Sequence, residues 1–411
     1  MLTVLAPTDA PTRSAATLDF DASQSTWFDR PQLPVADCVP EEGTGAYATL
    51  RRYGAQALRQ ERIPRHYFKM PGEERDERIW ALRHQLGERL VILGHHYQRD
   101  EVVQFADFRG DSFKLSQQAA GRKDASSILF CGVHFMAESA DILAADRQRV
   151  ILPNLAAGCS MADMADEPQV RSCWQQLGDA VGGGTVPVTY MNSSAALKAF
   201  CGEHGGVVCT SSNASRVLEW AFERGERVLF FPDEHLGRNS GVKLGIPDDA
   251  MVVWDPRRPL GGASMDALRR TKLVLWRGWC SVHARFTVAQ IEAARRAHPG
   301  ISIIVPPECR REVVDAADLD GSTERILEAI STSPSGSAWA VGTEINMVNR
   351  LAAAHPDKRI FCLDPVICPC STMYRIHPAY LAWVLEALVR GEVVNEITVS
   401  ESVKASARVA L

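Results

Sequence analysis

The sequence has no uninterrupted apolar run of about 18 residues, the length that a membrane-spanning helix needs. Its first residues lack the basic and apolar segments of a secretory signal peptide. The formal net charge of −5 at pH 7 lacks the excess of lysine and arginine that nucleic-acid and anionic-membrane binders carry. We therefore expect a cytoplasmic protein that binds neither nucleic acid nor membranes.

Cysteine pairs with the Cys-x-x-Cys spacing are also missing from the sequence. The 11 cysteines include no Cys-x-x-Cys pair, the spacing that closed structural zinc sites favour. Their number is odd, and in a reducing cytosol they are thiols and not a disulfide framework. Most free cysteines are small buried hydrophobic residues. A subset that is set apart by its context is a candidate for binding a metal centre.

The length of 411 residues predicts two or three domains. Residues 1–75 are predicted to be an N-terminal extension that is partly disordered and then helical. One helix is predicted from Ala46 to Gln60 and another from Pro71 to about Leu86. The remainder is predicted to form a first α/β domain over 76–185, a second over 186–285 with an insertion at about 237–265, and a third over 286–411 with a C-terminal helix.

The stretch Val91–Tyr97 sets the pattern for the rest of the chain. Its apolar residues end at Gly94 and are followed by the polar rings of His95, His96 and Tyr97. A short apolar run that is closed by a glycine is typical of a buried strand. In α/β proteins, polar groups at the carboxyl end of such a strand face a ligand crevice. This stretch therefore predicts a functional site.

Three units repeat this pattern with the same order of landmarks. Each has a strand with polar or unusual residues at its end, a hydroxyl at a predicted helix start, a strand with a turn, and a further strand that ends at a cysteine. The hydroxyl and cysteine pairs are Ser112 and Cys159, Ser211 and Cys280, and Thr323 and Cys370. The first and third pairs are 47 residues apart, and the second pair is 69 apart because its unit holds the insertion.

The repeat predicts an α/β fold of three pseudo-symmetric α/β/α domains, each with a parallel sheet, around a common centre. Cys159, Cys280 and Cys370 would converge there, one from each domain. Spacing alone leaves two interpretations open: buried core thiols, or thiolate ligands of an iron–sulfur cluster. Three protein ligands on a cluster of four irons leave one iron open, and an open iron is a Lewis acid that helps to expel water.

The same strand ends and helix starts supply candidate binding and catalytic groups. A hydroxyl at a helix start either caps the helix or, together with backbone N–H groups, binds an anion. Three equivalent hydroxyls at one centre, those of Ser112, Ser211 and Thr323, favour carboxylate or phosphate binding. The acid–base and orienting candidates are His95, Tyr97, Tyr190, Asn192, His283 and Glu308.

Motifs from about residue 75 to the end of the chain, taken in order, resemble those of the bacterial quinolinate synthase (NadA) family. The motifs are His95–Tyr97, Gly110–Ser112, Phe130–Glu138, Ala157–Asp163, Tyr190–Asn192, Thr210–Ala214, Cys280–Phe286, Pro307–Cys309, Gly321–Thr323 and Gly342–Glu344. The first 45 or so residues lie outside the resemblance.

This resemblance implies a triplicated α/β/α fold and one 4Fe–4S cluster with three cysteine ligands and one open iron. It implies an enzyme that condenses iminoaspartate with dihydroxyacetone phosphate to quinolinate, with loss of phosphate and water, on the de novo route to NAD. Carried over by motif, the cluster ligands are Cys159, Cys280 and Cys370. Substrate contacts are expected at His95, Ser112, Tyr190, Asn192, Ser211, Glu308 and Thr323, and catalytic groups at Tyr97, His283 and Glu308.

Two positions bear on this assignment. Cys368 offers a second thiol beside Cys370; we favour Cys370 because of the 47-residue interval and because Cys370 to Met373 matches the family pattern. The family usually has a histidine where this chain has Pro306. One contact to an anion or a metal site is therefore missing or is supplied by another residue.

Two other functions remain as alternatives. A different 4Fe–4S hydro-lyase would dehydrate a single small hydroxy acid and would not depend on a triose phosphate. An iron- or redox-sensing protein would need a DNA-binding pattern, and the sequence has no evident helix-turn-helix or basic face. Because iminoaspartate is unstable, a transient contact with the enzyme that produces it is also expected.

Overall fold

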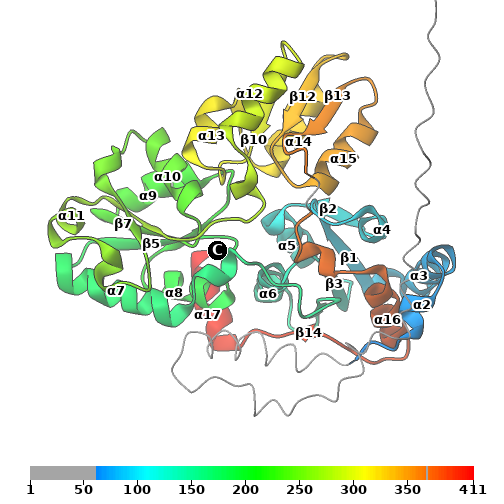
Figure 1. The fold of residues 1–411 in the computed structure, drawn as a ribbon. Coiled ribbons are helices and arrows are strands. Elements are labelled where there is room, and N and C mark those ends of the chain that lie inside the picture. The colour runs from blue at the N-terminus through cyan, green and yellow to red at the C-terminus, as the bar shows by residue number, and fades with distance from the viewer. Residues whose placement is uncertain (1–61, 367–368) are drawn as a thin grey trace, which may run out of the picture. The chain divides into compact units, whose positions relative to one another are not determined.

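The computed structural model describes residues 62–366 and 369–411 (Figure 1). The predicted helix from Ala46 to Gln60, and the predicted disordered segment before it, lie outside the described residues. The helix predicted from Pro71 is confirmed as α3 (Gly72–Leu86), which Pro71 precedes at the N-cap. Acidic residues fill its first turn, where the helix dipole favours negative charge. Within the described ranges, no helix is long and apolar enough to cross a membrane.

The first sheet has five strands in the order β14-β4-β3-β1-β2, and all but β14 run parallel. All six residues of β1 are buried, as expected for a central strand of a parallel sheet that helices cover on both faces. The strands are β1 (Leu90–His95), β2 (Phe108–Gly110), β3 (Ser127–Cys131), β4 (Arg149–Ile151) and β14 (Glu396–Ile397).

The second and third sheets are parallel throughout. The second has the order β6-β5-β7-β9-β8, with strands β5 (Thr185–Tyr190), β6 (Val207–Cys209), β7 (Arg227–Phe231), β8 (Met251–Trp254) and β9 (Leu273–Trp276). The third has the order β11-β10-β12-β13, with strands β10 (Ser302–Val305), β11 (Leu319–Asp320), β12 (Ala338–Val341) and β13 (Arg359–Cys362).

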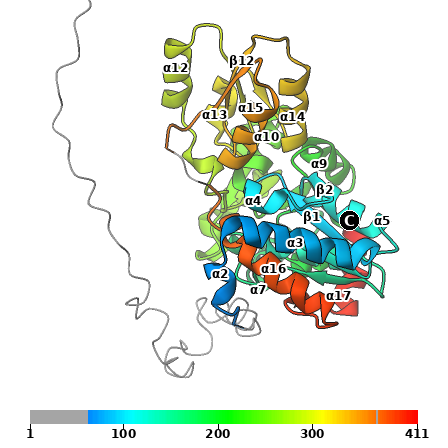
Figure 2. The ribbon, with the colours of Figure 1, turned by 90° about the vertical axis from the view of Figure 1, so that its right-hand side faces the viewer.

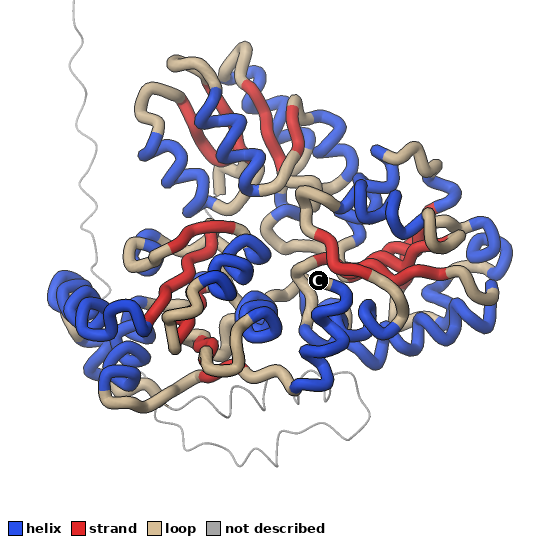
Figure 3. Tube along the Cα trace, turned by 180° about the vertical axis from the view of Figure 1, so that it is seen from behind, coloured by secondary structure: helices blue, strands red, loops and turns tan. Residues whose placement is uncertain are grey.

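One strand order therefore occurs three times. The order β2-β1-β3-β4 of the first sheet recurs as β6-β5-β7-β9 in the second and as β11-β10-β12-β13 in the third. Figure 3 shows three groups of strands with helices on their faces. The predicted fold class, three α/β/α units with largely parallel sheets, is confirmed.

The helices repeat in the same way. In each unit one helix precedes the first strand and one follows each of the first three strands. The helices before the first strands are α3, α7 (Glu167–Val181) and α12 (Val288–Ala297). Those after the first strands are α4 (Asp100–Val103), α8 (Ala195–Glu203) and α13 (Arg311–Ala316). Those after the second are α5 (Ser112–Gly121), α9 (Ala214–Phe222) and α14 (Thr323–Thr332), and those after the third are α6 (His134–Leu143), α10 (Glu234–Lys243) and α15 (Ile345–Ala354).

The end of the chain leaves the third sheet and packs on the other two units. Helix α16 (Pro378–Val389) lies against α3, β14 pairs with β4, and α17 (Glu401–Ala410) lies against α8 (Figures 1 and 2). Helix α10 occupies the start of the predicted insertion, and β8 and α11 (Met265–Arg270) follow it. The predicted domain limits themselves stay a prediction.

Each sheet has an apolar core of its own. Ile79 of α3 and Leu381 of α16 pack with the β1 side chains in the first unit. The buried indoles of Trp254 and Trp276 belong to the core of the second unit. Ile304 of β10 lies in a core of the third unit. These cores support the strand ends that carry the candidate site.

Candidate active site

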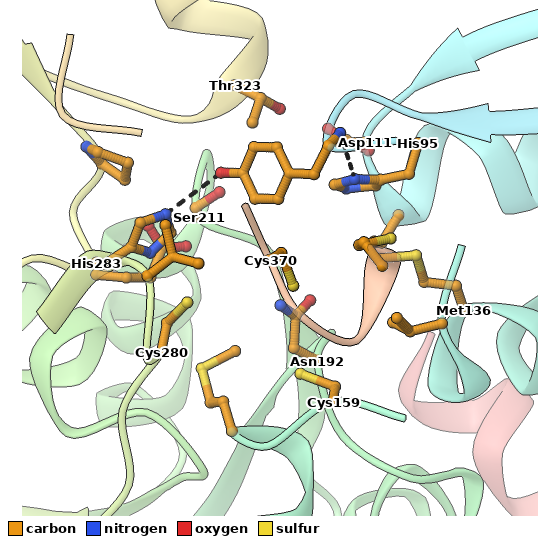
Figure 4. Close-up of a pocket in the computed structure, with 18 of the residues that line it drawn as sticks. His95, Asp111, Met136, Cys159, Asn192, Ser211, Cys280, His283, Thr323 and Cys370 are labelled. Carbon is orange, nitrogen blue, oxygen red and sulfur yellow. Dashed lines mark hydrogen bonds between the residues drawn. The ribbon is translucent and has the colours of Figure 1, made fainter. Parts of the chain in front are cut away.

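One pocket is lined by residues of all three units (Figure 4). In Figure 4 the three pocket cysteines lie in its lower half, and Thr323 and His95 lie in its upper half. The lining includes every site residue predicted from the sequence: His95, Tyr97, Ser112, Cys159, Tyr190, Asn192, Ser211, Cys280, His283, Glu308, Thr323 and Cys370. The structure thus brings these residues together, while the roles predicted for them stay predictions.

At the helix starts beside the pocket, the N-cap residues are not the three hydroxyl residues that the sequence analysis singled out. Asp111, the N-cap of α5, accepts a hydrogen bond from the Lys114 amide at 2.8 Å, and Ser322 caps α14 in the same way. Ser112 and Thr323 are therefore first residues of their helices and do not serve as caps. The α9 helix has Asn213 as its N-cap, two residues after Ser211. None of the three hydroxyl residues is thus the N-cap of its helix, and anion binding by them stays a prediction.

The three cysteines begin the same local turn. Cys159 follows β4, Cys280 follows β9 and Cys370 follows β13, each the last strand in the four-strand order that the three sheets share. Their carbonyl oxygens accept hydrogen bonds from the amide four residues on, at 3.0, 2.9 and 2.9 Å. A short 3₁₀ helix forms after each of them: Ala162–Met164, His283–Arg285 and Met373–Arg375.

Backbone N–H groups of these turns donate to the three sulfur atoms. Burial raises the pKa of Cys159 and of Cys280 to about 12, and it also raises the pKa of Cys370. Without a cation the three thiols are therefore neutral, and a metal centre would stabilise them as thiolates.

The three pocket cysteines are candidate ligands of an iron–sulfur cluster. The residues described by the structure contain no group of three or more His, Cys, Asp or Glu that could hold one metal ion. In a cluster each thiolate binds a different iron, so the sulfur atoms are further apart than around one ion. N–H donors to sulfur are a usual feature of such clusters. Cys368, the other candidate for the third ligand, lies outside the described residues.

Tyr97 links the first unit to the third. Its hydroxyl lies 2.8 Å from Oγ1 of Thr343 and 3.3 Å from Nε2 of His283. Burial raises the pKa of Tyr97 well above its usual value, so the phenol is neutral. Burial lowers the pKa of His283, so the imidazole is neutral as well. The pair combines a proton donor with a proton acceptor.

Glu308 and Tyr190 form a second pair across units. The Tyr190 hydroxyl donates to Oε1 of Glu308 at 2.6 Å, and both side chains are buried. Burial, followed by the charge of Glu308, raises the pKa of Tyr190. The hydrogen bond supplies the partner that the sequence indicated Glu308 would need.

His95 is oriented by the backbone beside it. Its Nδ1 accepts a hydrogen bond from the Tyr97 amide at 3.1 Å, which places the ring proton on Nε2. Burial lowers the pKa of His95 well below its usual value, so the ring is a neutral hydrogen-bond donor.

Several residues that line the pocket or contact its lining were not predicted from the sequence. Asp111 and Ser322 line the pocket beside the predicted hydroxyls, and the pattern of a polar residue before a helix could have identified them as caps. Thr343 contacts Tyr97 from a distant part of the chain, and no local signal indicates this contact. The apolar part of the lining includes Met136 and Met161.

Comparison with known proteins shows the family of this chain. A sequence model of the quinolinate synthetase A (NadA) family matches residues 77–411. The chain belongs to the quinolinate synthase family. A quinolinate synthase of Corynebacterium glutamicum is 62% identical to it over 358 residues, which are 87% of this chain and 91% of that protein. Quinolinate synthases of a Nocardioides species and of Streptomyces coelicolor are 57% and 55% identical, over 82% and 81% of this chain and 87% and 86% of their own lengths.

Pro306 lines the pocket of this quinolinate synthase family member. Its carbonyl oxygen accepts a hydrogen bond from the Cys309 amide at 3.1 Å, which closes a turn around Glu308. A proline ring has no hydrogen-bond donor, so position 306 contributes shape and not polarity to the lining. The polar contacts of this corner come from Glu308 and Tyr190.

Proposed function

We propose that the chain is a quinolinate synthase. It condenses iminoaspartate with dihydroxyacetone phosphate to quinolinate, with loss of phosphate and water, on the de novo route to NAD. The observation that carries this proposal is the single pocket that gathers cysteines, hydroxyls and acid–base groups from three units. The family match over residues 77–411 supports it.

One 4Fe–4S cluster is proposed to be bound by Cys159, Cys280 and Cys370, with one iron left open. The three equivalent turns and the N–H donors at each sulfur support this ligand set. When bound, the cluster supplies a Lewis acid that polarises a carbonyl or hydroxyl group. Because Cys368 lies outside the described residues, the preference for Cys370 rests on its turn and on the 47-residue interval.

Ser112, Ser211 and Thr323 are proposed to bind the anionic ends of the two substrates. Ser112 and Thr323 begin helices of 10 residues each, whose free N–H groups and dipole attract carboxylate and phosphate. His95, Tyr190, Asn192 and Glu308 complete the proposed substrate contacts. Holding both substrates in one orientation lowers the entropic cost of their condensation.

Tyr97, His283 and Glu308 are proposed to move the protons of enolisation, imine formation and dehydration. The neutral Tyr97 phenol donates a proton to a departing oxygen. Nε2 of His283 lies 3.3 Å from that phenol and accepts or returns the proton. Glu308, which Tyr190 holds at Oε1, is the carboxylate base.

The test is made on protein purified without oxygen. We expect a brown protein with about four irons per chain that forms quinolinate from freshly generated iminoaspartate and dihydroxyacetone phosphate. A colourless protein that takes up no iron on reconstitution would contradict the cluster. A brown protein that makes no quinolinate but dehydrates a single hydroxy acid would favour the alternative hydro-lyase.

Single cysteine variants test the ligands. C159A, C280A and C370A are each expected to lose the brown chromophore and turnover together. C173A is the matched control, because Cys173 is a fully buried thiol of α7 that does not line the pocket. A pocket variant that keeps its full iron content and activity would remove that cysteine from the ligand set.

A transient complex with an iminoaspartate-producing enzyme is also proposed, because iminoaspartate is unstable. Immobilised protein should retain such an enzyme from a bacterial extract, and a pull-down without enrichment over an unrelated protein would contradict this. The expected cytoplasmic location stays a prediction.

A further inference from the structure

Three side chains that do not line the pocket bind the backbone around residues that do. Each donates hydrogen bonds to two carbonyl oxygens, one before and one after a single pocket residue. The side chains are Asn239, Arg350 and Lys198, and the pocket residues between the carbonyls are Glu308, Tyr97 and Asn192.

Asn239 of α10 reaches from the second unit to the third. Its Nδ2 lies 2.8 Å from the carbonyl oxygen of Pro307 and 2.8 Å from that of Cys309. Because both partners can only accept, the amide must present its NH₂ group to them. The side chain is 2% exposed, so no water replaces these bonds in the folded protein. One amide thus holds a carbonyl group on each side of Glu308.

Arg350 of α15 does the same from the third unit to the first. Its Nη1 donates to the Gln98 carbonyl oxygen at 2.6 Å, and its Nη2 donates to the carbonyl oxygen of His96. Asp100 accepts a further bond from Nη1 at 2.7 Å. A guanidinium group suits this task because its N–H groups form a rigid planar fork. The two carbonyl groups flank Tyr97.

Asn239 and Arg350 stand at equivalent positions. Helix α10 begins at Glu234 and α15 begins at Ile345, so each residue is the sixth of its helix. Both helices follow the third strand of their units. The sixth residue of the corresponding helix α6 is Ser139, whose hydroxyl donates to the Phe135 carbonyl of its own helix instead.

In the second unit, Lys198 of α8 binds the two carbonyl groups on either side of Asn192. It is fully buried, and its Nζ lies 2.9 Å from the Met191 carbonyl oxygen and 2.5 Å from that of Ser193. The first unit also binds this part of the second unit, because Glu138 of α6 accepts a 2.9 Å hydrogen bond from the Ala195 amide at the start of α8. The loop after the first strand is therefore bound in every unit: by Arg350 in the first, by Lys198 in the second and by Asn239 in the third.

We propose that Asn239, Arg350 and Lys198 are positioning residues of the reaction, which fix the direction of Glu308, Tyr97 and Asn192. The carbonyl before the pocket residue belongs to the planar peptide group that bounds its φ angle, and the carbonyl after it belongs to the peptide group that follows the next residue. When both are held, the short backbone segment between them, which carries the pocket side chain, has little freedom to move. This inference rests on the proposed function, because it assigns the three pocket residues a part in that reaction.

Asn239 is tested by N239D, which keeps the size of the side chain but replaces the donor by an acceptor. The kcat is expected to fall about 10- to 100-fold, because a displacement of about 1 Å in a catalytic group costs that much. N395D is the matched control, since Asn395 is buried and donates to the Pro153 carbonyl at 2.8 Å outside the pocket. Equal losses in both variants, or a loss that only follows iron content, would overturn the assignment.

Arg350 is tested by R350A with added guanidinium chloride at millimolar concentration. A positioning role predicts a lower kcat that guanidinium partly restores and equal sodium chloride does not. R227K is the control for a buried arginine that binds a backbone carbonyl elsewhere, since Arg227 donates to Thr271 at 3.0 Å. An R350A enzyme with wild-type kcat, or one that guanidinium does not improve, would contradict the role.

Hydrogen exchange gives a readout that does not depend on activity. In N239D the Cys309 amide should exchange faster while the Gln98 amide stays protected, and in R350K the order should reverse. If the wild-type protein makes no quinolinate, the proposed function fails while these exchange rates still decide whether the two loops are held. Unchanged exchange in both variants would overturn the inference even if quinolinate is formed.

Discussion

At the scale of single residues, the pocket combines groups that only work together when three units meet. Tyr97 of the first unit contacts Thr343 of the third, and Tyr190 of the second donates to Glu308 of the third. Burial keeps Tyr97 and His283 neutral. Proton transfer in such a site depends on geometry more than on charge, because neutral partners exchange protons only within hydrogen-bond reach.

The Tyr97 hydroxyl is therefore expected to matter more than any of its partners. Y97F removes the only proton that the side chain can donate and keeps the ring in place. We expect kcat to fall about 10²- to 10⁴-fold, the usual contribution of general acid–base catalysis. Steady-state quinolinate formation at saturating concentrations of both substrates measures it.

The control for this prediction is T343V, which removes the 2.8 Å partner but leaves the phenol in place. Its kcat should stay well above that of Y97F. Iron content and the visible spectrum should match the wild type in both variants. A Y97F enzyme with more than half of the wild-type kcat would show that another group moves the proton.

Sequence patterns located the pocket residues but not their interactions. The repeat identified Ser112, Thr323 and the cysteines because strand ends and helix starts leave local signals. Asp111 and Ser322 carry the local pattern of an N-cap, a polar residue before a helix, but the sequence analysis did not assign them this role. Thr343 and Asn239 were missed because their contacts join segments far apart in the chain.

At the scale of elements, α16 has a titratable residue at its N-cap. Nδ1 of His377 accepts a hydrogen bond from the Ala379 amide at 3.0 Å, so the cap requires a neutral ring. Burial, followed by the charges of Arg99 and Arg75, lowers the pKa of His377 to about 4. Between about pH 6.5 and 4 the unfolded chain therefore binds more protons at this position than the folded chain.

This difference predicts acid destabilisation through α16. The contribution is fully present above pH 6.5 and is lost as the pH falls towards 4. Because the ring is only half-buried, we expect a loss of about 1–2 kcal/mol after allowance for solvent screening. Urea unfolding at a series of pH values measures it.

H377N supplies the matched comparison for this element. Asparagine keeps a side-chain acceptor at the N-cap but does not titrate in this range. The wild type should lose stability relative to H377N as the pH falls from 6.5 to 4, and the two should differ little in pH dependence above that range. Parallel stability curves over the whole range would mean that protonation of His377 does not reach the cap.

Most elements could be predicted, but the course of the chain end could not. The strands leave short buried runs between glycines and helix starts, which is a local signal. The pairing of β14 with β4 and the packing of α16 on α3 depend on surfaces that other parts of the chain create. From the sequence alone, these last residues are assigned to the third unit, which precedes them in the chain. In the structure they bury their apolar side chains against the first and second units.

At the scale of the whole molecule, α17 joins the C-terminal end to the second unit by a close helix crossing. Gly202 of α8 lies at this crossing, and a Cβ atom there would be 1.9 Å from the carbonyl oxygen of Ser406 in α17. Backbones this close exclude any side chain. Helix α17 thus anchors the C-terminal end of the described chain to the second unit. Strand β14, which pairs with the first unit, precedes α17 in the sequence.

G202A should therefore force α17 away from α8. We expect a loss of about 1–3 kcal/mol, the usual cost of overpacking, although alanine is the better helix former. G178A in α7 is the control, because nothing lies within 4 Å of a Cβ atom at that position. The same change should stabilise that helix by up to about 1 kcal/mol. Opposite changes in stability in the two variants would separate the effect of the close helix crossing from that of helix propensity.

Thermal unfolding of both variants decides between a tightly and a loosely attached chain end. If α17 is attached tightly, G202A lowers the melting temperature, G178A does not, and hydrogen exchange rises in α17 before it rises in the strands. If G202A is as stable as the wild type, α17 moves away from α8 without loss of stability, and the chain end is attached loosely. Because the crossing lies outside the pocket, the G202A protein that remains folded should keep its iron and its kcat, which makes attachment of the chain end a property of stability and not of the chemistry.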